Sequence, residues 1–374
     1  MKFQDSNSQV FISLLRAGLW EKEVRLQEYD SVDYEKIYRI AEEQSVTGLV
    51  AAGIEHIVDN KPRQADVFPF LSTVLTLEQR NTGMNGFIKA LYLKLKEASI
   101  NAILVKGQGI AQCYERPKWR ACGDVDLLLD EENYNKSRII LAGTASNVSR
   151  ETVHNRHLAM TIKGWEVELH GTLRSGLGSR IDKSIDEIQG ICHKNRGIRI
   201  WNNDGEAIPL PAPDNDIIFV FTHILQHLFQ GGIGLRQICD WCRLLWTYRD
   251  SLDRVLLERR IRSMKLLSEW RSFGELAVSF LGMPKEALPL YEEKSIWSRK
   301  AERVLSFILE TGNFGHNRDS SYHNKYSFVI YKTISFLQTS WDSIRLLFVF
   351  PKDTTRVWWK MFYEGMGRAV NGIT

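Results

Sequence analysis

Two aspartates one residue apart, Asp124 and Asp126, come directly before the apolar run Leu127 to Leu129. Side chains alternate between the two faces of a strand, so both carboxylates would point the same way, with their Cα atoms roughly 6.5 Å apart. Paired carboxylates repel each other unless a cation lies between them, and oxygen ligands suit Mg²⁺ or Mn²⁺. The bare triplet also fits an acidic turn, but the apolar run that follows is typical of a buried strand. We therefore predict a strand that carries a metal site.

A third carboxylate comes from residues 165–170, which read Trp-Glu-Val-Glu-Leu-His. The alternation of this segment predicts a second strand, with Glu168 and His170 on one face and the apolar side chains on the other. Carboxylates from neighbouring strands can hold two divalent ions about 3.5–4 Å apart, which activate an attacking oxygen and neutralise a leaving phosphate. The alternative, which periodicity alone favours, is that Glu168 is an ordinary solvent-facing strand residue.

A phosphate-binding corner is predicted where Lys106 and Gly107 follow a short apolar strand at residues 102–105. A helix expected from Gly107 to Tyr114 would present free backbone amides at its start, and these can hold phosphate. Lys106 could pair with a phosphate oxygen; the alternative is a solvated lysine beside a turn glycine. In the polar loop that follows, Arg120 could contact a substrate phosphate or brace the loop.

The order of these residues resembles the uncharacterised nucleotidyltransferase family of the polymerase-beta superfamily. The resemblance covers residues 100–172 and is carried by Lys106, Gly107, Tyr114, Pro117, Arg120, Gly123, Asp124, Asp126, Leu127, Leu128, Glu168 and His170. It implies that Asp124 and Asp126 bind the metals, with Glu168 as the third carboxylate. It also implies that the Gly107 helix start holds the triphosphate. That superfamily has Gly-Gly or Gly-Ser at this start, whereas this chain has Gly107 and Gln108, which leaves the backbone amides for phosphate binding.

Four more candidates lie on two expected helices further along the chain. His223 and His227 are four residues apart, so both imidazoles fall on one helix face. Arg236 and Asp240 repeat this spacing on the next helix. The resembling family often carries a His-rich helix and then a helix with Arg and Asp here. Together with His170, we therefore take these residues as possible acceptor-site residues; the alternative for the histidines is a packing or capping role.

Composition limits the class of protein. The chain has 374 residues, of which 44% are hydrophobic and 25% are charged, as in soluble globular proteins of two or three units. Its net charge of +4 is spread along the chain. A dedicated nucleic-acid binder would concentrate Lys and Arg on one face, so we expect no such role. No apolar run approaches the roughly 20 residues that span a membrane.

Cysteine usage indicates a reduced, cytoplasmic setting. The cysteines number five, an odd count, and the first ten residues show no signal-peptide pattern. Cys239 and Cys242 have metal-like spacing, but no second pair completes a zinc site, so we predict two buried thiols. His154 and His157 are expected near the site, although a lone histidine is more often a structural hydrogen-bonding residue.

The elements that must position these residues form an α+β protein, with a nucleotidyltransferase-like mixed sheet core and helical regions on both sides. We expect a helical N-terminal region at 1–99, a catalytic core at 100–212 and a helical C-terminal domain at 213–374, with the prolines near 209–213 at the second boundary. Helices are predicted at 9–20, 31–44, 46–58, 66–99, 215–230, 235–248, 251–282, 295–312, 325–347 and 354–370. Further strands are predicted at 151–154, 157–163, 198–200 and 207–210.

The function that follows is a metal-dependent nucleotidyltransferase. It would use Mg²⁺ (or Mn²⁺) to move a nucleoside monophosphate from an NTP to a hydroxyl or phosphate acceptor, a small molecule or a protein, and release pyrophosphate. Glu168 would help to deprotonate the acceptor. The alternative is a catalytically inactive nucleotide-binding or regulatory protein of the same fold, which the Gly107–Gln108 departure motivates.

Overall fold

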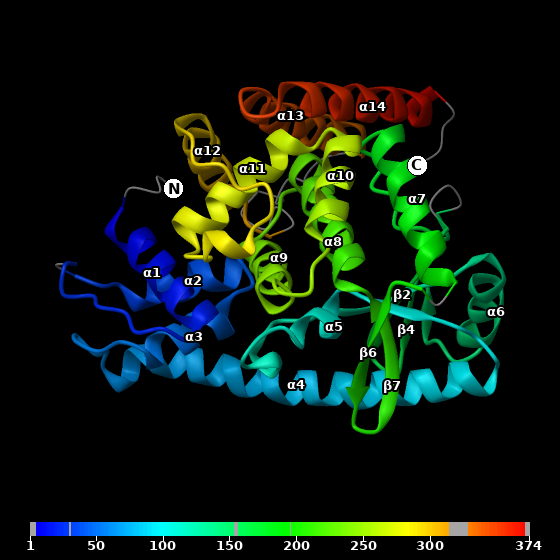
Figure 1. Cartoon of the computed structure of the whole chain (residues 1–374), viewed down its shortest axis with the longest axis horizontal. Coiled ribbons are helices and arrows are strands. Elements are labelled where there is room, and N and C mark those ends of the chain that lie inside the picture. The colour runs from blue at the N-terminus through cyan, green and yellow to red at the C-terminus, as the bar shows by residue number, and fades with distance from the viewer. Residues whose placement is uncertain (1–4, 30, 153–155, 195, 314–327, 371–374) are drawn as a thin grey trace.

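A helix of 34 residues, α4 (Gln64–Glu97), underlies much of the molecule. The computed structural model describes residues 5–29, 31–152, 156–194, 196–313 and 328–370. In Figure 1, α4 runs along the bottom of the view, below the N-terminal helices on one side and the β-strands on the other. Gly83 does not divide the helix: a Cβ there would lie 3.3 Å from the Trp165 ring, so the missing side chain makes room for that ring.

The N-terminal helices pack beside one end of α4. They are α1 (Ser6–Trp20), α2 (Tyr34–Glu43) and α3 (Thr47–Glu55). Asp33 caps α2, because its side chain accepts a hydrogen bond from the Lys36 amide at 3.0 Å. The predicted start of this helix at residue 31 is therefore wrong by a few residues, because the Asp33 side chain satisfies the free amide at the start.

The central sheet has five strands in the order β1-β2-β5-β4-β3. Strand β2 runs parallel to β5, and the other neighbouring pairs are antiparallel, so the sheet is mixed and the predicted α+β class is confirmed. The strands are β1 (Ile103–Val105), β2 (Asp124–Leu128), β3 (Asn147–Val148), β4 (His157–Ile162) and β5 (Trp165–His170). Within the strand predicted at 151–154, Thr152 forms an isolated bridge with His157; residues 153–155, including His154, lie outside the described residues.

The two faces of this sheet differ in chemistry. Val125, Leu127, Val167 and Leu169 are buried in one apolar cluster with residues of α4 such as Ile88. The alternation of β2 and β5 then turns their acidic side chains to the opposite face. Burial of one sheet face against α4 thus fixes where the carboxylates point. A separate hairpin, β6 (Ile198–Asn203) and β7 (Glu206–Pro211), packs beside β1.

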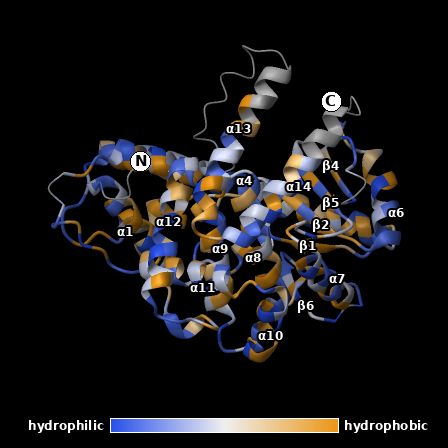
Figure 2. Ribbon diagram, turned by 90° about the horizontal axis from the view of Figure 1, so that it is seen from above, coloured by the Kyte–Doolittle hydropathy of each residue, from blue (hydrophilic) through white to orange (hydrophobic). Residues whose placement is uncertain are grey.

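Helices cover the acidic side of the sheet and form most of the C-terminal half. Figure 2 shows apolar residues gathered on α8 and α9 near the middle of the molecule. The region predicted as one helical stretch near 251–282 contains two helices, because Lys265 adopts a left-handed conformation between them. The helices are α5 (Gly107–Ala111), α6 (Glu131–Ala142), α7 (Ser179–His193), α8 (Pro213–Gln230), α9 (Leu235–Thr247), α10 (Arg254–Met264), α11 (Leu267–Glu275), α12 (Ser295–Thr311), α13 (Phe328–Leu347) and α14 (Pro351–Val370).

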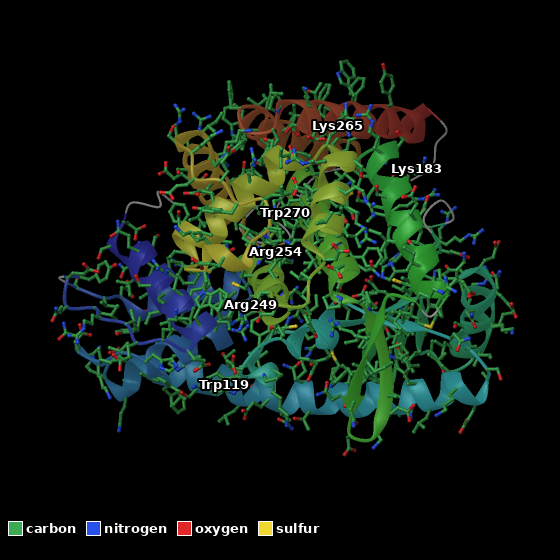
Figure 3. The ribbon with its side chains drawn as sticks, viewed as in Figure 1. Trp119, Lys183, Arg249, Arg254, Lys265 and Trp270 are labelled. Carbon is green, nitrogen blue, oxygen red and sulfur yellow. The ribbon has the colours of Figure 1, made fainter. Side chains whose placement is uncertain are left out.

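The Trp270 side chain, labelled in Figure 3, fixes α8, α9 and α11 to one another. Its ring centroid lies 4.9 Å from those of Phe221 on α8 and Trp241 on α9. Its indole nitrogen donates a hydrogen bond to the Pro289 carbonyl at 2.7 Å. Buried aromatic pairs of this kind stabilise by about 0.5–1.5 kcal/mol beyond the area they bury. The two helices that face the acidic side of the sheet are therefore firmly held.

One hydrophobic cluster contains side chains of the N-terminal helices, the strands and the C-terminal helices, among them Leu14, Val105 and Trp241. The three-part division at residues 99 and 212 stays a prediction. Cys239 and Cys242 are buried free thiols, as predicted. Among the described residues, no helix combines the length and apolar character that crossing a membrane requires.

Candidate active site

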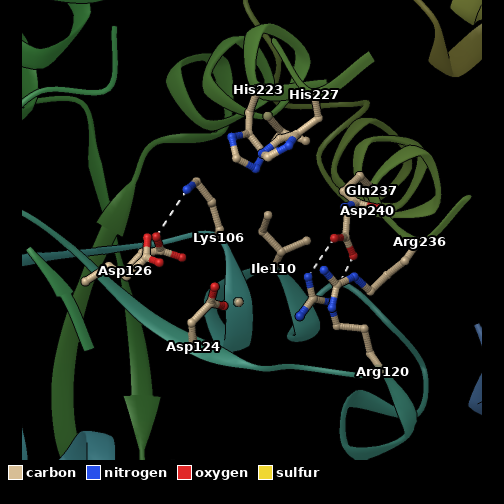
Figure 4. A pocket seen from close by; sticks show the side chains of 13 residues that line it. Lys106, Ile110, Arg120, Asp124, Asp126, His223, His227, Arg236, Gln237 and Asp240 are labelled. Carbon is tan, nitrogen blue, oxygen red and sulfur yellow. Dashed lines mark hydrogen bonds and ion pairs between the residues drawn. The ribbon is translucent and has the colours of Figure 1, made fainter. Parts of the chain in front are cut away.

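The three carboxylates predicted to act together lie on one wall of a single pocket. Strands β2 and β5 pair in register, so Asp126 stands directly opposite Glu168 and Asp124 opposite Glu166. Neighbouring strands lie about 4.8 Å apart, which brings the facing side chains within reach of a common ligand. A pocket of about 190 Å³ is lined by Asp124, Asp126 and Glu168, and α8 and α9 form its opposite wall (Figure 4).

Asp124 lies close to the negative charges of Asp126 and Glu168. The charge of Asp126 raises the pKa of Asp124, and burial and the charge of Glu168 raise it further. The shift means that these carboxylates are close enough to repel one another without full solvent screening. A cluster of this kind is relieved when a cation binds it.

Two basic side chains contact Asp126, which is only 2% exposed. Lys106 Nζ donates to Asp126 Oδ1 at 3.1 Å, and His170 Nε2 lies 2.6 Å from the same oxygen. Burial alone would raise the pKa of Asp126, but Lys106 and His170 outweigh it and hold the pKa below its usual value. Burial likewise lowers the pKa of His170, but its hydrogen bonds to Asp126 and Glu168 raise it overall. Asp126 is therefore ionised at neutral pH.

Glu168 contacts two imidazoles. Its Oε2 lies 3.1 Å from His157 Nε2 and 3.3 Å from His170 Nε2. Burial raises the pKa of Glu168, yet these two hydrogen bonds outweigh it and hold the pKa well below its usual range. His157 is predicted near the site, and the structure places it in contact with Glu168. Its place follows from the register of β4 and β5, which pairs His157 with His170 across the turn at Gly164.

The corner between β1 and α5 brings Lys106 to the pocket through unusual backbone geometry. Lys106 has φ 57° and ψ −145°, and Gly107 has φ 40°. A lysine with positive φ is uncommon and costs about 1–3 kcal/mol, which the surrounding structure must offset. A Cβ at Gly107 would lie 3.3 Å from Cys122 Sγ, so a side chain there would be both crowded and strained. The corner thus favours glycine at 107.

Gln108 does not present its side chain to the pocket. The side chain is 2% exposed, and its amide nitrogen donates to Asn81 Oδ1 on α4 at 2.7 Å. Helix α5 is also shorter than predicted, since it ends at Ala111 rather than at Tyr114. Phosphate binding at Gln108 through its backbone amide stays a prediction, and the side chain is bonded to Asn81 on α4 instead.

The helical wall of the pocket carries two imidazoles. His223 and His227 lie one turn apart on α8, with ring centroids 4.3 Å apart (Figure 4). Burial lowers the pKa of His227 to about 4. Burial, with the charge of Lys106, holds the pKa of His223 well below its usual value. Both rings are therefore neutral at physiological pH and can donate or accept hydrogen bonds there.

Two arginines and one carboxylate line the end of the pocket nearest α9. Arg120 Nε and Nη2 donate to the two oxygens of Asp240 at 3.0 and 2.6 Å, and Tyr114 donates to the same group at 2.8 Å. Arg236 donates to the Ala121 carbonyl at 2.9 Å, and its buried Nε has no hydrogen-bond partner among the described residues. This end of the pocket therefore has an excess of positive charge. The carboxylates of Asp124 and Asp126 lie on the other side (Figure 4).

A second pocket, of about 290 Å³, lies beside the first and shares Lys106, Glu168, His223 and His227 with it. His170 lines the second pocket only, whereas Arg236 and Asp240 line the first only. We call the first pocket the aspartate chamber and the second the histidine chamber. The five possible acceptor-site residues thus do not surround one space; they are divided between two chambers that meet at Glu168 and Lys106.

Residues 30–282, well over half of the chain, match the model of a family described as uncharacterised nucleotidyltransferase. The chain belongs to this family. The matched range contains every residue that lines the aspartate chamber, and the resemblance predicted from the sequence is confirmed.

Among solved structures, the nucleotidyltransferase-family chain is similar to an antigenic nucleotidyltransferase-like protein from Paracoccidioides brasiliensis. The two share 15% sequence identity with a TM-score of 0.33, over 53% of this chain and 92% of that one. No curated protein matches the chain.

Proposed function

We propose that this family member is a metal-dependent nucleotidyltransferase that moves a nucleoside monophosphate from an NTP to a hydroxyl or phosphate acceptor and releases pyrophosphate. One observation carries the proposal. Asp124, Asp126 and Glu168, from two paired parallel strands, line one wall of a pocket that also contains buried cationic side chains. Such a pocket suits a polyanion that arrives with divalent cations.

The donor set fits Mg²⁺ or Mn²⁺. Asp124, Asp126 and Glu168 offer carboxylate oxygens, which are the ligands that hard divalent ions prefer. The repulsion that raises the pKa of Asp124 is relieved when a cation binds. Bound ions would neutralise charge on the phosphates and activate the attacking oxygen.

Charge balance supports a polyphosphate substrate. Four carboxylates line the aspartate chamber, against one lysine, two arginines and two histidines that are neutral at physiological pH. The chamber alone is therefore slightly negative, and it becomes positive once divalent ions are bound. A triphosphate then supplies the opposite charge. Arg236, at the positively charged end of the chamber, could form a second ion pair with the triphosphate.

Lys106 and Glu168 occupy the boundary at which the two substrates would meet. Lys106 would seat a phosphate group, with the Gly107 and Gln108 amides beside it. Glu168 is ionised at neutral pH and would accept the hydrogen bond of the acceptor hydroxyl. A carboxylate of such low pKa is a weak base, so its larger contribution would be to orient that hydroxyl for attack.

The two chambers suggest where each substrate binds. We assign the NTP to the aspartate chamber and the acceptor to the histidine chamber, where His170 would contact it. His223 and His227 would contact both substrates, because they line both chambers. Arg236 and Asp240 would then belong to the nucleotide side. A small molecule or a protein side chain fits this arrangement, and the dispersed net charge of +4 disfavours a dedicated nucleic-acid acceptor. A cytoplasmic location agrees with the five free thiols.

The test is transfer of label from α- and γ-³²P NTPs in the presence of Mg²⁺ and cell extract. Nucleotidyl transfer labels an acceptor from the α-labelled NTP and none from the γ-labelled NTP. The double variant Asp124→Asn/Asp126→Asn should transfer nothing, whereas Glu166→Gln, an exposed neighbour on β5, should behave as wild type. Equal transfer by the double variant would eliminate the mechanism. Nucleotide binding without transfer to any acceptor would favour the inactive, regulatory alternative.

A further inference from the structure

Three side chains in the wall between the two chambers converge although sequence reasoning did not group them. His157, Glu168 and His170 each offer one ligand atom, and these three atoms lie within 4.8 Å of one another. His157 and His170 are register partners on the antiparallel strands β4 and β5, and Glu168 is two residues before His170. All three therefore share one sheet face, so the backbone itself holds them together.

The separations suit an ion bound between the groups. Glu168 Oε2 lies 3.1 Å from His157 Nε2 and 3.3 Å from His170 Nε2. Ligand atoms at about 2.0–2.1 Å from a tetrahedral ion are about 3.3 Å from one another. The two imidazole rings lie side by side, with their centroids 4.9 Å apart, so both can turn a nitrogen to the same ion.

The chemistry of the donors differs from that of the aspartates. Two imidazoles and one carboxylate form the ligand set of open, three-ligand zinc sites, and imidazole favours transition metals over Mg²⁺. Both imidazole contacts use Oε2 of Glu168. A bridging carboxylate can hold one ion with each oxygen, as in two-metal sites. Glu168 could therefore serve a hard ion on the aspartate side and a softer ion on the histidine side.

The space between these three side chains is accessible to solvent. The side chains of His157 and Glu168 are 33% and 25% exposed. Both line the histidine chamber, which gives an ion a path from solvent and space for a further ligand. His170 is the least exposed of the three, with 11% of its side chain accessible, and its Nε2 would exchange the 2.6 Å contact with Asp126 for the ion.

We propose that His157, Glu168 and His170 bind a divalent transition-metal ion, with Zn²⁺ as the ion of choice, at the wall between the two chambers. Three protein ligands leave coordination positions for water or for an oxygen atom of a bound substrate. The inference does not rest on nucleotidyl transfer, because metal binding can be measured without any nucleotide.

Isothermal titration of EDTA-treated protein with ZnCl₂ tests the site. Wild type should bind one Zn²⁺ per chain at this site, and His157→Asn and His170→Asn should each weaken that binding by at least about tenfold. His56→Asn is a matched control: His56 also pairs with a glutamate, Glu21, at 2.6 Å, but the pair gains no third donor among the described residues. Equal Zn²⁺ affinity in wild type and His157→Asn, or an equal loss in His56→Asn, would overturn the proposal.

X-ray absorption of the Zn²⁺-loaded wild type keeps the proposal testable if a variant fails to fold. The expected first shell has two imidazole nitrogens and oxygen atoms at about 2.0–2.1 Å, and no sulfur. A shell that contains sulfur would place the ion at cysteines such as Cys239 and Cys242 and would refute the assignment. A shell with fewer than two imidazoles would refute it as well. Because neither readout uses an NTP, failure here is separate from failure of the transferase proposal.

Discussion

Asp126 and Glu168 face each other across the parallel strands β2 and β5, and the His170 imidazole lies within 3.3 Å of an oxygen of each. The two carboxylates belong to segments more than forty residues apart, and the sheet holds them in fixed register. Backbone pairing is stiffer than a loop, so their positions depend little on side-chain freedom. This rigid acidic face and the groups that balance its charge determine what the pocket can bind.

Removing the charge of Asp126 should slow transfer strongly. Bound divalent ions contribute several kcal/mol to the reaction, so Asp126→Asn is expected to reduce the transfer rate by about a thousandfold. Glu166→Gln should retain the wild-type rate, because Glu166 is exposed and contacts Thr161. Initial rates with a purified acceptor fraction measure both. Similar losses in the two variants would contradict a special role for Asp126.

Asp124→Asn should stabilise the protein when metal ions are absent. Asp126 and then burial raise the pKa of Asp124 in the folded state. The stability linked to its protonation is therefore present at acid pH and is lost as pH rises through the raised pKa. At pH 7 in EDTA, the variant should have a higher Tm than wild type. Mg²⁺ should raise the Tm of wild type and change that of the variant less. Identical Mg²⁺ responses in thermal melts would argue against metal binding at Asp124.

The buried pair between Arg120 and Asp240 should matter for stability. Asp240→Ala leaves the Arg120 guanidinium, 5% exposed, without its carboxylate and is expected to cost about 3–5 kcal/mol. The exposed pair of Arg174 and Asp186 has similar geometry, with contacts of 2.7 and 2.6 Å. Asp186→Ala should cost less than about 1 kcal/mol, because solvent screens that pair. Urea unfolding compares the two, and equal costs would contradict the assigned role of burial.

Acid should destabilise the fold partly through His227. Its pKa falls from the usual 6.5 to about 4 because it is buried, so the unfolded chain binds a proton that the folded chain does not. The stability that neutral His227 preserves is present above pH 6.5 and is lost as pH falls towards 4. In His227→Gln, the loss of unfolding free energy between pH 7 and pH 4 should be smaller than in wild type by at most about 3 kcal/mol. Solvent around the partly exposed side chain reduces this difference. Unfolding titrations at pH 7 and pH 4 measure the difference. A slope equal to that of wild type would show that His227 does not titrate in this way.

Much of the acidic face could be predicted because its signal is local. The period of two in residues 124–128 and 165–170 already assigns each side chain to a face. The apolar half of each pattern then points to the core. The spacing of side chains along one strand is fixed. The clustering of the three carboxylates could therefore be predicted once the two strands were assumed to pair.

The long-range partners could not be predicted in this way. Arg120 donates a hydrogen bond to Asp240, which is 120 residues later in the chain, and the Gln108 side chain donates one to Asn81 on α4. No periodicity within either segment encodes such contacts, which depend on how helices pack on the sheet. His157 is an intermediate case. The turn at Gly164 fixes the register of β4 against β5, so its pairing with His170 was within reach of sequence reasoning.

A crystal structure of the complex with a non-hydrolysable NTP and Mg²⁺ would show whether the two aspartates hold the metal ions of a bound nucleotide. We expect Mg²⁺ at about 2.0–2.1 Å from carboxylate oxygens of Asp124 and Asp126. We also expect phosphate oxygens within hydrogen-bond distance of Lys106 Nζ, and the nucleotide in the chamber that contains Arg236. A nucleotide bound elsewhere, or ions that contact neither aspartate, would contradict the proposed transferase site.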